Sequence, residues 1–526
     1  MGGSFCGGSK FVPFLMLFLL VASCSEQANP NKNLKLSDYD SLRVGSYVVS
    51  PSKVHVEMER LMSADKWTCQ ADGYVRRYYR NKGPFIWINR IGVAPRADSL
   101  LAYLPKVCLM GFSPGSFRMG AIASDLRRVK NLDFDNHNNQ ASKVFARLEY
   151  NLTRAYLRYV AGQRFGFVSP GAIFNHLEAK DGDSSRTTYK TLFDIRAERP
   201  GDKFWQTALR KVRQDSVAEF MAEVEPRNPL YRQLLHLLHS PLAHKYGRHL
   251  ILVNLERSRW RLPDDPYLHD RYVLVNIPSF HLVANDGNES LSMRMGCGST
   301  KTKTPLIVSK ITRMDVNPQW IVPRSIVKSS IARHAGSSSW FASHRYFVRE
   351  RNTGKVVDAS GVTPAMLFGG GYLVVQEGGE GNSLGRIIFR FNNGQSIFLH
   401  GTPNPRVFQR TVRDVSHGCV RLERPLALAG FLLGKGRSDM LDKVVYSARA
   451  DVSPLGKDPR ALTERQKEVL DTLDRKRLVG RVKVEPDVPV FILYYTLFPN
   501  SKGGWDAYRD VYGYDVPILD RIRSFM

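Results

Sequence analysis

The stretch GRIIFRFNNGQSIFLHG, residues 385–401, predicts a β-hairpin that ends on a histidine. Asn393-Gly394 is a favoured hairpin turn, and apolar residues alternate along each flanking strand. These residues are Ile387, Phe389, Phe391, Ile397 and Leu399. Because successive side chains of a strand point to opposite faces, His400 is expected on the face opposite Leu399.

More short strands are expected before this hairpin. From residue 249 the pattern changes to a period of two, in HLILVNLERSRW (249–260) and RYVLVNIPSFHLVA (271–284). A turn at Asp286-Gly287 is followed by alternating Leu291, Met293 and Met295. Short strands joined by hairpin turns favour a mainly antiparallel sheet or sandwich.

The chain before residue 245 is predicted to be mainly helical. Apolar residues recur at helical spacing in VAPRADSLLAYLPKVCLMGFSP (93–114), ASKVFARLEYNLTRAYLRYVAGQRFG (141–166) and NPLYRQLLHLLHSPL (228–242). In the first of these stretches, one expected helix carries Leu100, Leu104 and Cys108 on a single face. The fold class is therefore α+β, with a helical N-terminal scaffold followed by a mainly antiparallel, β-sandwich-like domain.

The composition shifts suggest a domain layout for the 526 residues. We expect a leader peptide, a polar tether, a helical scaffold domain, a sheet domain with an inserted lid, and a C-terminal extension packed on the sheet domain. Their ranges are 1–23, 24–40, 41–245, 246–450 with the lid at 325–382, and 451–526.

The lid assignment rests on a long segment between expected strands. The segment is rich in serine and glycine and carries the aromatic residues Trp340, Phe341, Tyr346 and Phe347. A segment of this length in a compact domain is usually a functional loop or a small subdomain. The alternative is a disordered insertion.

The net charge of +27 favours an anionic partner or a solvated basic surface. No nucleic-acid-binding motif accompanies the charge, so a nucleic-acid partner is not expected. Four cysteines, Cys69, Cys108, Cys297 and Cys419, remain beyond residue 24, and their spacing suggests no metal site. A Cys69–Cys108 disulfide is possible in an exported protein, and no cofactor is expected.

The N-terminus has the pattern of an export signal. Lys10 precedes an apolar run from Phe11 to Val21, which is shorter than the roughly 20 residues that span a bilayer. The run ends in VASC, which resembles a bacterial lipobox and implies cleavage before Cys24 and lipid on its sulfur. An ordinary signal peptide is the alternative. Acylation would anchor a periplasmic protein of the cell envelope to a membrane.

The stretch RDVSHGCVRLERP, residues 413–425, collects groups for nucleophilic catalysis. Cys419 is a candidate nucleophile, because a thiolate attacks carbonyl groups when a base or positive charge activates it. His400 and His417 are both candidate bases, and spacing alone does not choose between them. Gly418 allows a sharp bend that presents backbone N–H groups near the sulfur. The alternative is an inert buried cysteine beside a structural histidine.

Two polar neighbours complete this candidate site. Ser416 can support a histidine through its hydroxyl group, and Arg421 lies on the strand face of Cys419, where it could hold a carboxylate through two hydrogen bonds.

At this point HGTPNPRVFQRTVRDVSHGCVRLE, residues 400–423, resembles the signature of bacterial L,D-transpeptidases. The resemblance extends to a subgroup with an N-terminal helical scaffold and covers most of the chain. It implies that Cys419 is the nucleophile and His400 the base, oriented by the Gly401 carbonyl. It also implies that His417 and Gly418 offer backbone N–H groups to an oxyanion and that Ser416 supports them.

The resemblance also implies substrate contacts. Arg421 stands where many relatives have asparagine, and we interpret it as a substrate anchor together with Thr402 and the lid residues Trp340 and Tyr346. One departure is that residues 175–240 show no clear peptidoglycan-binding repeat, which puts a separate wall-binding module in doubt.

The implied reaction is peptidoglycan biosynthesis by 3→3 cross-linking of stem peptides through a cysteine thioester, with sensitivity to carbapenems. A hydrolytic L,D-carboxypeptidase or endopeptidase would use the same atoms. A non-catalytic wall-binding lipoprotein is a third interpretation, against which the His400 and Cys419 pair argues.

Overall fold

The computed structural model describes residues 49–66, 68–89, 92–134, 137–180, 187–287, 289–455, 457 and 462–526. The expected signal peptide, the tether and the lipidation site Cys24 lie outside these residues. Within the described part, no helix combines the length and apolar character needed to cross a membrane. The described residues divide into two compact units, one formed by those within 49–161, 201–225 and 525–526 and the other by those within 162–200 and 226–524.

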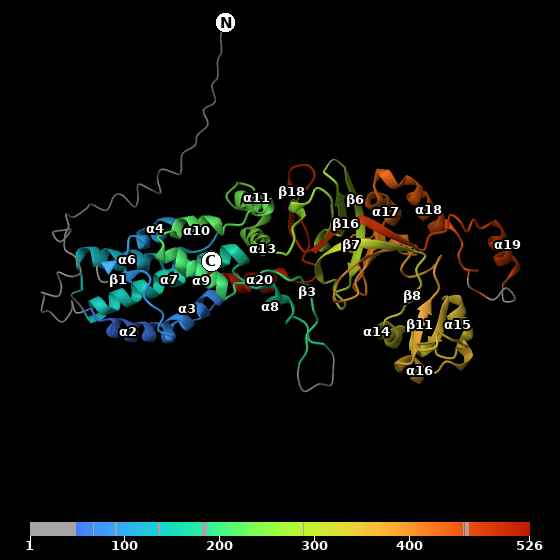
Figure 1. Ribbon diagram of the computed structural model, residues 1–526, viewed down its shortest axis with the longest axis horizontal. Helices are drawn as coiled ribbons and strands as arrows, with labels where there is room; N and C mark the ends of the chain where they lie inside the picture. The colour runs from blue at the N-terminus through green and yellow to red at the C-terminus, as the bar shows by residue number, and fades with distance from the viewer. Residues whose placement is uncertain are drawn as a thin grey trace, which may run out of the picture. The chain divides into compact units, whose positions relative to one another are not determined.

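The first unit is helical (Figure 1), which confirms the predicted N-terminal scaffold. Its helices are α2 (Pro51–Ala64), α3 (Gln70–Arg80), α4 (Arg96–Tyr103), α5 (Lys106–Leu109), α6 (Met119–Asn131), α7 (Ala141–Phe165), α9 (Asp202–Arg213) and α10 (Val217–Glu223). A small antiparallel pair, β1 (Ile88–Asn89) and β2 (Gly92–Val93), completes the unit. The single helix expected in the stretch 93–114 is interrupted before Pro105, whose ring cannot continue a helix interior, and Cys108 is exposed.

Helix α7 forms the core of this unit. Most of its residues are buried, so polar groups on it need internal partners. Glu149 is fully buried, and its carboxylate accepts hydrogen bonds from the backbone N–H groups of Ile86, Trp87 and Ile88 at 2.7–3.1 Å. This one side chain therefore fixes the chain between α3 and β1 against α7.

The second unit is built on a sheet that closes on itself. The strand order is β12-β13-β15-β6-β5-β4-β16-β7, and β12 also pairs with β7, so eight strands of the described chain form a ring. Most pairs are antiparallel, but β13 and β15 are parallel, as are β16 and β4. The strands are β4 (Tyr272–Asn276), β5 (His281–Asn285), β6 (Ser290–Gly298), β7 (Leu306–Val316), β12 (Ile387–Phe391), β13 (Leu399–His400), β15 (Val420–Leu422) and β16 (Arg481–Leu493).

Both predicted hairpins are present in this ring. β5 pairs with β6, and β12 pairs with β13, with Ile388 opposite His400. The fold class predicted from the sequence is thus confirmed, but the sheet closes into a ring instead of forming two separate layers. Two short strands flank it: β3 (Phe193–Asp194) pairs with β7, and β14 (Asp414–Ser416) pairs with β6.

Helices cover parts of this sheet. α17 (Pro425–Leu433) packs on β6 and β16, and α18 (Ser438–Arg449) packs on β7. The remaining helices of the unit outside the insertion are α8 (Pro170–Phe174), α11 (Pro229–Leu238), α12 (Ala243–Tyr246), α13 (Arg248–Arg259), α19 (Glu464–Thr472) and α20 (Asp515–Ile522). Two short strands, β17 (Leu497–Pro499) and β18 (Trp505–Ala507), pair with each other.

The strand predicted over residues 249–260 is wrong, because this stretch forms helix α13. Every residue from Ile251 to Arg259 is buried. A helix that is buried on all sides has no polar stripe, so its sequence lacks the helical period and looks like a buried strand. The polar side chains of the helix find internal partners instead, such as the ion pair between Arg259 and Glu256 at 3.2 Å.

The C-terminal residues are more than an extension packed on the sheet domain. β16 lies between β4 and β7 in the ring, so the sheet cannot close without residues 481–493. A strand added this late in the chain cannot be placed from the sequence, because periodicity predicts a strand but not its neighbours.

The insertion at residues 325–382 is a folded subdomain and not a disordered loop (Figure 1). Its sheet has the order β10-β9-β11-β8 and packs on a core of its own that includes Phe341, Val348 and Val374. Its elements are β8 (Trp320–Ile321), α14 (Arg324–Ile326), a π-helix (Val327–Ile331), α15 (Ser338–Ser343), β9 (Tyr346–Glu350), β10 (Val356–Val357), α16 (Pro364–Phe368) and β11 (Tyr372–Gln376).

Candidate active site

His400 is the last residue of β13, and Cys419 directly precedes β15, the neighbouring strand; both side chains lie on the same face of the sheet. β13 and β15 run parallel, with Leu399 opposite Val420 and His400 opposite Arg421. Leu399 and Val420 are fully buried and point into the core. Because side chains alternate, His400, Arg421 and Cys419 must therefore point to the outer face of the ring. The two central residues of the predicted site are thus brought together, as the candidate chemistry requires.

The loop between β14 and β15 is held by Ser416. Its hydroxyl group donates to the Cys419 carbonyl at 2.5 Å and accepts from the Gly418 N–H at 3.1 Å. Gly418 has φ +120°, which side-chain-bearing residues rarely adopt. The family resemblance implies that Gly418 offers its N–H to an oxyanion; in this structure that N–H donates to Ser416. Within the described residues, the N–H groups of His417 and Cys419 have no acceptor and remain available.

A second layer of residues, which the sequence analysis missed, supports this loop. The Thr304 hydroxyl donates to the Gly418 carbonyl at 2.7 Å and accepts from the Gly298 N–H at 2.8 Å. The Tyr512 hydroxyl donates to the Gly298 carbonyl at 2.7 Å. Thr302 donates to the Ser416 carbonyl at 3.0 Å. These partners come from distant parts of the chain, so no local sequence pattern identifies them.

Two glycines permit close backbone contacts beside the reactive groups. A Cβ atom on Gly298 would lie 2.1 Å from the Thr302 carbonyl oxygen and 3.0 Å from the Gly418 Cα. A Cβ atom on Gly385 would lie 2.6 Å from the backbone of Gly401, next to His400. The close contacts set the positions of Cys419 and His400 through the backbone.

The His400 imidazole is buried and neutral. Its Nδ1–H donates to the Gly401 carbonyl at 2.6 Å, the orientation that the family resemblance implies, which leaves Nε2 as the basic atom. Burial, and next the positive charge of Arg421, lower the pKa of His400 to about 4, against the opposing effect of the Gly401 and Leu384 carbonyls. The ring is therefore unprotonated at neutral pH and able to accept a proton.

The Cys419 side chain is a neutral thiol in this structure. Burial raises its pKa, while the Phe398 backbone and the Arg421 charge act in the opposite direction. Its S–H faces the Ser396 carbonyl at 3.9 Å, and within the described residues it makes no hydrogen bond to His400. Such contacts in unliganded active sites often form only with substrate bound.

The positive charge of Arg421 acts on both members of this pair. Arg421 lies opposite His400 in the register of β13 and β15, and its Nε is buried without a hydrogen-bond partner in the described structure. Of the other predicted residues, His417 is exposed, and Thr402 is half-buried beside a cavity of about 410 Å³ that Arg386, Gly401 and Pro425 also line.

Trp340 and Tyr346 form part of an aromatic stack in the inserted subdomain. The Trp340 ring lies 4.1 Å from His334 and 5.6 Å from Tyr346, and both residues pack on the core of the subdomain. Among the described residues, no ring contact or hydrogen bond joins either side chain to Cys419 or His400. Tyr346 is nevertheless connected to the site, because its hydroxyl lies beside Ser383, the neighbour of Leu384.

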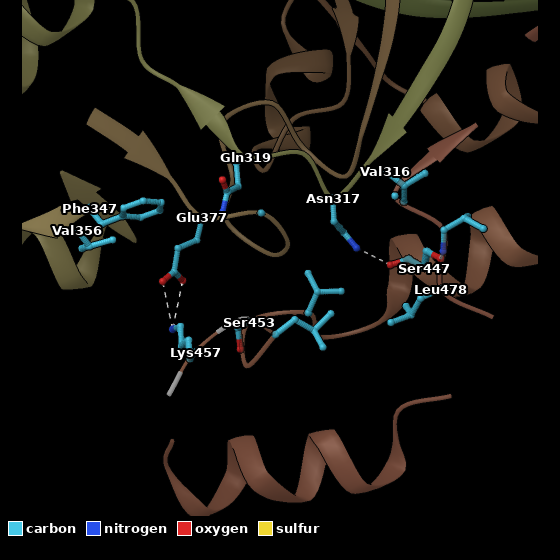
Figure 2. A pocket seen from close by; sticks show the side chains of 15 residues that line it. Val316, Asn317, Gln319, Phe347, Val356, Glu377, Ser447, Ser453, Lys457 and Leu478 are labelled. Carbon is cyan, nitrogen blue, oxygen red and sulfur yellow. Dashed lines mark hydrogen bonds and ion pairs between the residues drawn. The ribbon is translucent and has the colours of Figure 1, made fainter. Parts of the chain in front are cut away.

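The inserted subdomain joins the sheet at a pocket of about 520 Å³ that is lined by both apolar and polar side chains (Figure 2). Glu377 of the subdomain forms an ion pair with Lys457 at 3.2 Å, and the Asn317 amide donates to the Ser447 carbonyl at 2.5 Å. Close by, the fully buried Asn382 donates to the carbonyls of Pro318 and Glu377. Hydrogen bonds therefore hold the chain segment that leads from the subdomain to His400.

The four cysteines in the described residues are free, so the possible Cys69–Cys108 disulfide is not formed. The described part of the chain contains no cluster of His, Cys, Asp and Glu that could bind a metal ion.

Two stretches of the chain match known protein families. Residues 270–452 match the family of L,D-transpeptidase catalytic domains, and residues 73–238 match a family described as the scaffold domain. A protein of Haemophilus influenzae named "Putative L,D-transpeptidase" is 27% identical to this chain over 324 residues. That match covers 61% of this chain and 60% of the relative. These findings confirm the family resemblance seen in the sequence.

Proposed function

We propose that this chain, a member of the L,D-transpeptidase family with a scaffold domain before its catalytic domain, cross-links peptidoglycan through a thioester on Cys419. The observation that carries the proposal is the placement of His400 and Cys419 on one face of adjacent strands inside the matched catalytic domain. The neutral imidazole and the unoccupied N–H groups of His417 and Cys419 supply the other parts that acyl transfer needs.

The first step forms the acyl-enzyme. The Cys419 thiol passes its proton to Nε2 of His400, and the sulfur attacks the carbonyl carbon of the diamino acid in a tetrapeptide stem. The N–H groups of His417 and Cys419 stabilise the oxyanion. Collapse of this intermediate breaks the peptide bond, His400 returns the proton to the leaving amine, and D-alanine departs.

The second step transfers the acyl group to an amine. The side-chain amine of a second stem attacks the thioester, His400 accepts the proton that the amine loses, and the Cys419 thiol is regenerated. The product is a 3→3 cross-link. Because the thioester conserves the energy of the original peptide bond, the transfer needs no ATP, which suits a reaction outside the cytoplasm.

A membrane anchor is the second part of the proposal. Acylation of Cys24 in VASC would tether the enzyme beside the cell wall in the periplasm. Replacing Cys24 with alanine should release the protein from membranes into the soluble periplasmic fraction without changing Cys419 reactivity. Equal membrane recovery of both forms would reject the anchor.

Intact mass measurement tests the nucleophile. Incubation with a carbapenem should add one covalent adduct to the wild-type protein and none to Cys419→Ala. A second adduct site, or labelling of the alanine variant, would contradict the assignment of Cys419.

Product analysis separates transfer from hydrolysis. Incubation with stem tetrapeptides should give cross-linked dimers, with D-alanine released in a matching amount. Trimmed monomers without dimers would favour the hydrolytic alternative, in which water reaches the thioester before the amine.

A further inference from the structure

A row of side chains crosses the outer face of the sheet from Cys419. The register places Arg421, His400, Ile388, Asp315 and Arg481 side by side on five successive strands. Two residues away along each strand, and therefore on the same face, a second row contains Cys419, Phe398, Arg390, Arg313 and Lys483. The Arg390 guanidinium lies over the Phe398 ring at 4.8 Å, as this arrangement requires.

Three arginines of these rows share one carboxylate. Arg390 forms an ion pair with one oxygen of Asp315, while Arg313 and Arg481 approach the other oxygen at 3.4 and 3.6 Å. One negative charge therefore faces three positive charges. We call Arg313, Arg390 and Arg481 the arginine row.

The arginine row retains unused hydrogen-bonding capacity. A guanidinium carries five N–H donors. The Arg313 Nε is buried and faces Asp315 Oδ1 at 3.4 Å without a hydrogen bond, so the donors open to a ligand are those on the exposed parts of the three guanidinium groups. The side chains of Arg313, Arg390 and Arg481 are 40%, 28% and 71% exposed, so a ligand can reach them. Excess positive charge with free donors is the usual composition of a site for carboxylates or phosphates.

The distance between Cys419 and the arginine row matches the length of a short peptide substrate. Neighbouring strands are about 4.8 Å apart, so the backbone of Arg390 lies about 10 Å and that of Arg313 about 14 Å from that of Cys419. A peptide of three to four residues extends over this length. Phe398 lies between Cys419 and Arg390, and its half-buried aromatic ring offers a surface to such a peptide.

We propose that the arginine row is a subsite that binds a carboxylate of the peptide whose carbonyl or amine reacts at Cys419. This inference rests on the proposed function and adds a specificity determinant to it. The ligand class is an acidic peptide. The subsite discriminates in favour of stems with free carboxylates and against stems in which these groups are amidated.

Binding measurements on the full chain test the donor substrate. The probe is a stem tetrapeptide with free carboxylates, compared with its amidated form, and Cys419→Ala serves as the background so that no reaction follows. Arg313→Gln and Arg390→Gln should each weaken binding of the acidic peptide about threefold to fivefold, as expected for partly exposed ion pairs. Binding of the amidated peptide should not change. Arg523→Gln, which removes a 63% exposed arginine paired with Asp520, is the control and should affect neither peptide.

Kinetics on the thioester-loaded enzyme test the acceptor substrate. If the carboxylate belongs to the acceptor, the same two substitutions raise the KM for the acidic acceptor. The kcat, and the KM for the amidated acceptor, stay unchanged. Either of two outcomes would overturn the subsite. In the first, both variants keep the wild-type affinity and KM; in the second, they lose as much affinity for the amidated peptide as for the acidic one. Absence of any acyl-enzyme on Cys419 would instead reject the proposed function.

Discussion

Arg158 in the helical unit and Arg313 on the sheet show two different uses of arginine. The Arg158 side chain is 2% exposed and makes two 2.6 Å hydrogen bonds to Asp72, with further bonds to the Ser116 carbonyl and the Thr68 hydroxyl. Arg313 is 40% exposed and has one long ion pair, to a carboxylate that two other arginines share.

The difference indicates which part of the molecule is built for stability and which for binding. A buried charge must be satisfied internally, because no solvent or ligand can do so. Burial alone would raise the pKa of Asp72, but the hydrogen bonds and charge of Arg158 outweigh it and hold the pKa below its ordinary value. On the outer face of the sheet, three partly exposed arginines share the single carboxylate of Asp315, so their positive charge is incompletely paired at positions that a substrate can reach.

The largest expected effect is on chemistry. Cys419→Ala should reduce acyl transfer at least 10³-fold, on the order of 4 kcal/mol of transition-state stabilisation, because it removes the sulfur on which the proposed thioester forms. The thermal unfolding curve should stay close to that of the wild type, because the side chain is only half-buried. Appreciable residual turnover of stem peptides would show that the reaction does not depend on this sulfur.

The next effect separates the two arginines directly. Arg158→Met should destabilise the helical unit by about 3 kcal/mol, because it leaves Asp72 charged and buried without its main partner. Arg313→Met should cost about 0.5 kcal/mol or less. Hydrogen exchange of amides in α3 and α7 measures the first change, and exchange in β7 measures the second. Similar losses in both variants would remove the distinction between the two regions.

The sequence predicted the parts of this comparison that depend on local patterns. The hairpin at 385–401 and the Ser-His-Gly-Cys stretch placed His400 and Cys419 correctly, since alternation decides which face each residue occupies. It could not predict the arginine row, because Arg313, Arg390 and Arg481 meet only through the register of three strands far apart in the chain. For the same reason the sequence does not predict that Thr304 and Tyr512 support the loop. The sequence of α13 predicts a strand because the helix is buried on all sides.

A smaller effect concerns the backbone contact behind the site. Gly298→Ala places a methyl group 2.1 Å from the Thr302 carbonyl oxygen, so the loop that carries Gly418 must shift. We expect a stability loss of about 2 kcal/mol and a fall in kcat with little change in KM, as for other overpacked sites. Gly361→Ala is the matched control, since nothing lies within 4 Å of its added methyl group. Normal kcat in Gly298→Ala would mean that this contact does not position Cys419.

The smallest expected effect concerns the rate of Cys419 acylation, which should not depend on pH in the range where a histidine usually titrates. Burial and Arg421 lower the pKa of His400 to about 4, and burial raises that of the Cys419 thiol. Between these limits the imidazole is neutral and the thiol protonated. The rate of Cys419 acylation should therefore be nearly constant from pH 5 to 8 and fall only as the pH approaches 4, where His400 gains a proton and can no longer act as the base.

Arg421→Gln tests the electrostatic origin of this flat profile. Removing the guanidinium takes away the second cause of the low pKa of His400, so the acidic limb of the acylation rate should move upward from pH 4 toward the ordinary histidine value of 6.5. Burial still acts on the ring, so the limb should stop short of that value. A wild-type profile that already falls near pH 6.5 would mean that His400 is not buried in the reacting enzyme. His400 would then no longer differ from an ordinary exposed histidine, and the electrostatic contrast between the active site and the buried ion pairs of the helical unit would not hold.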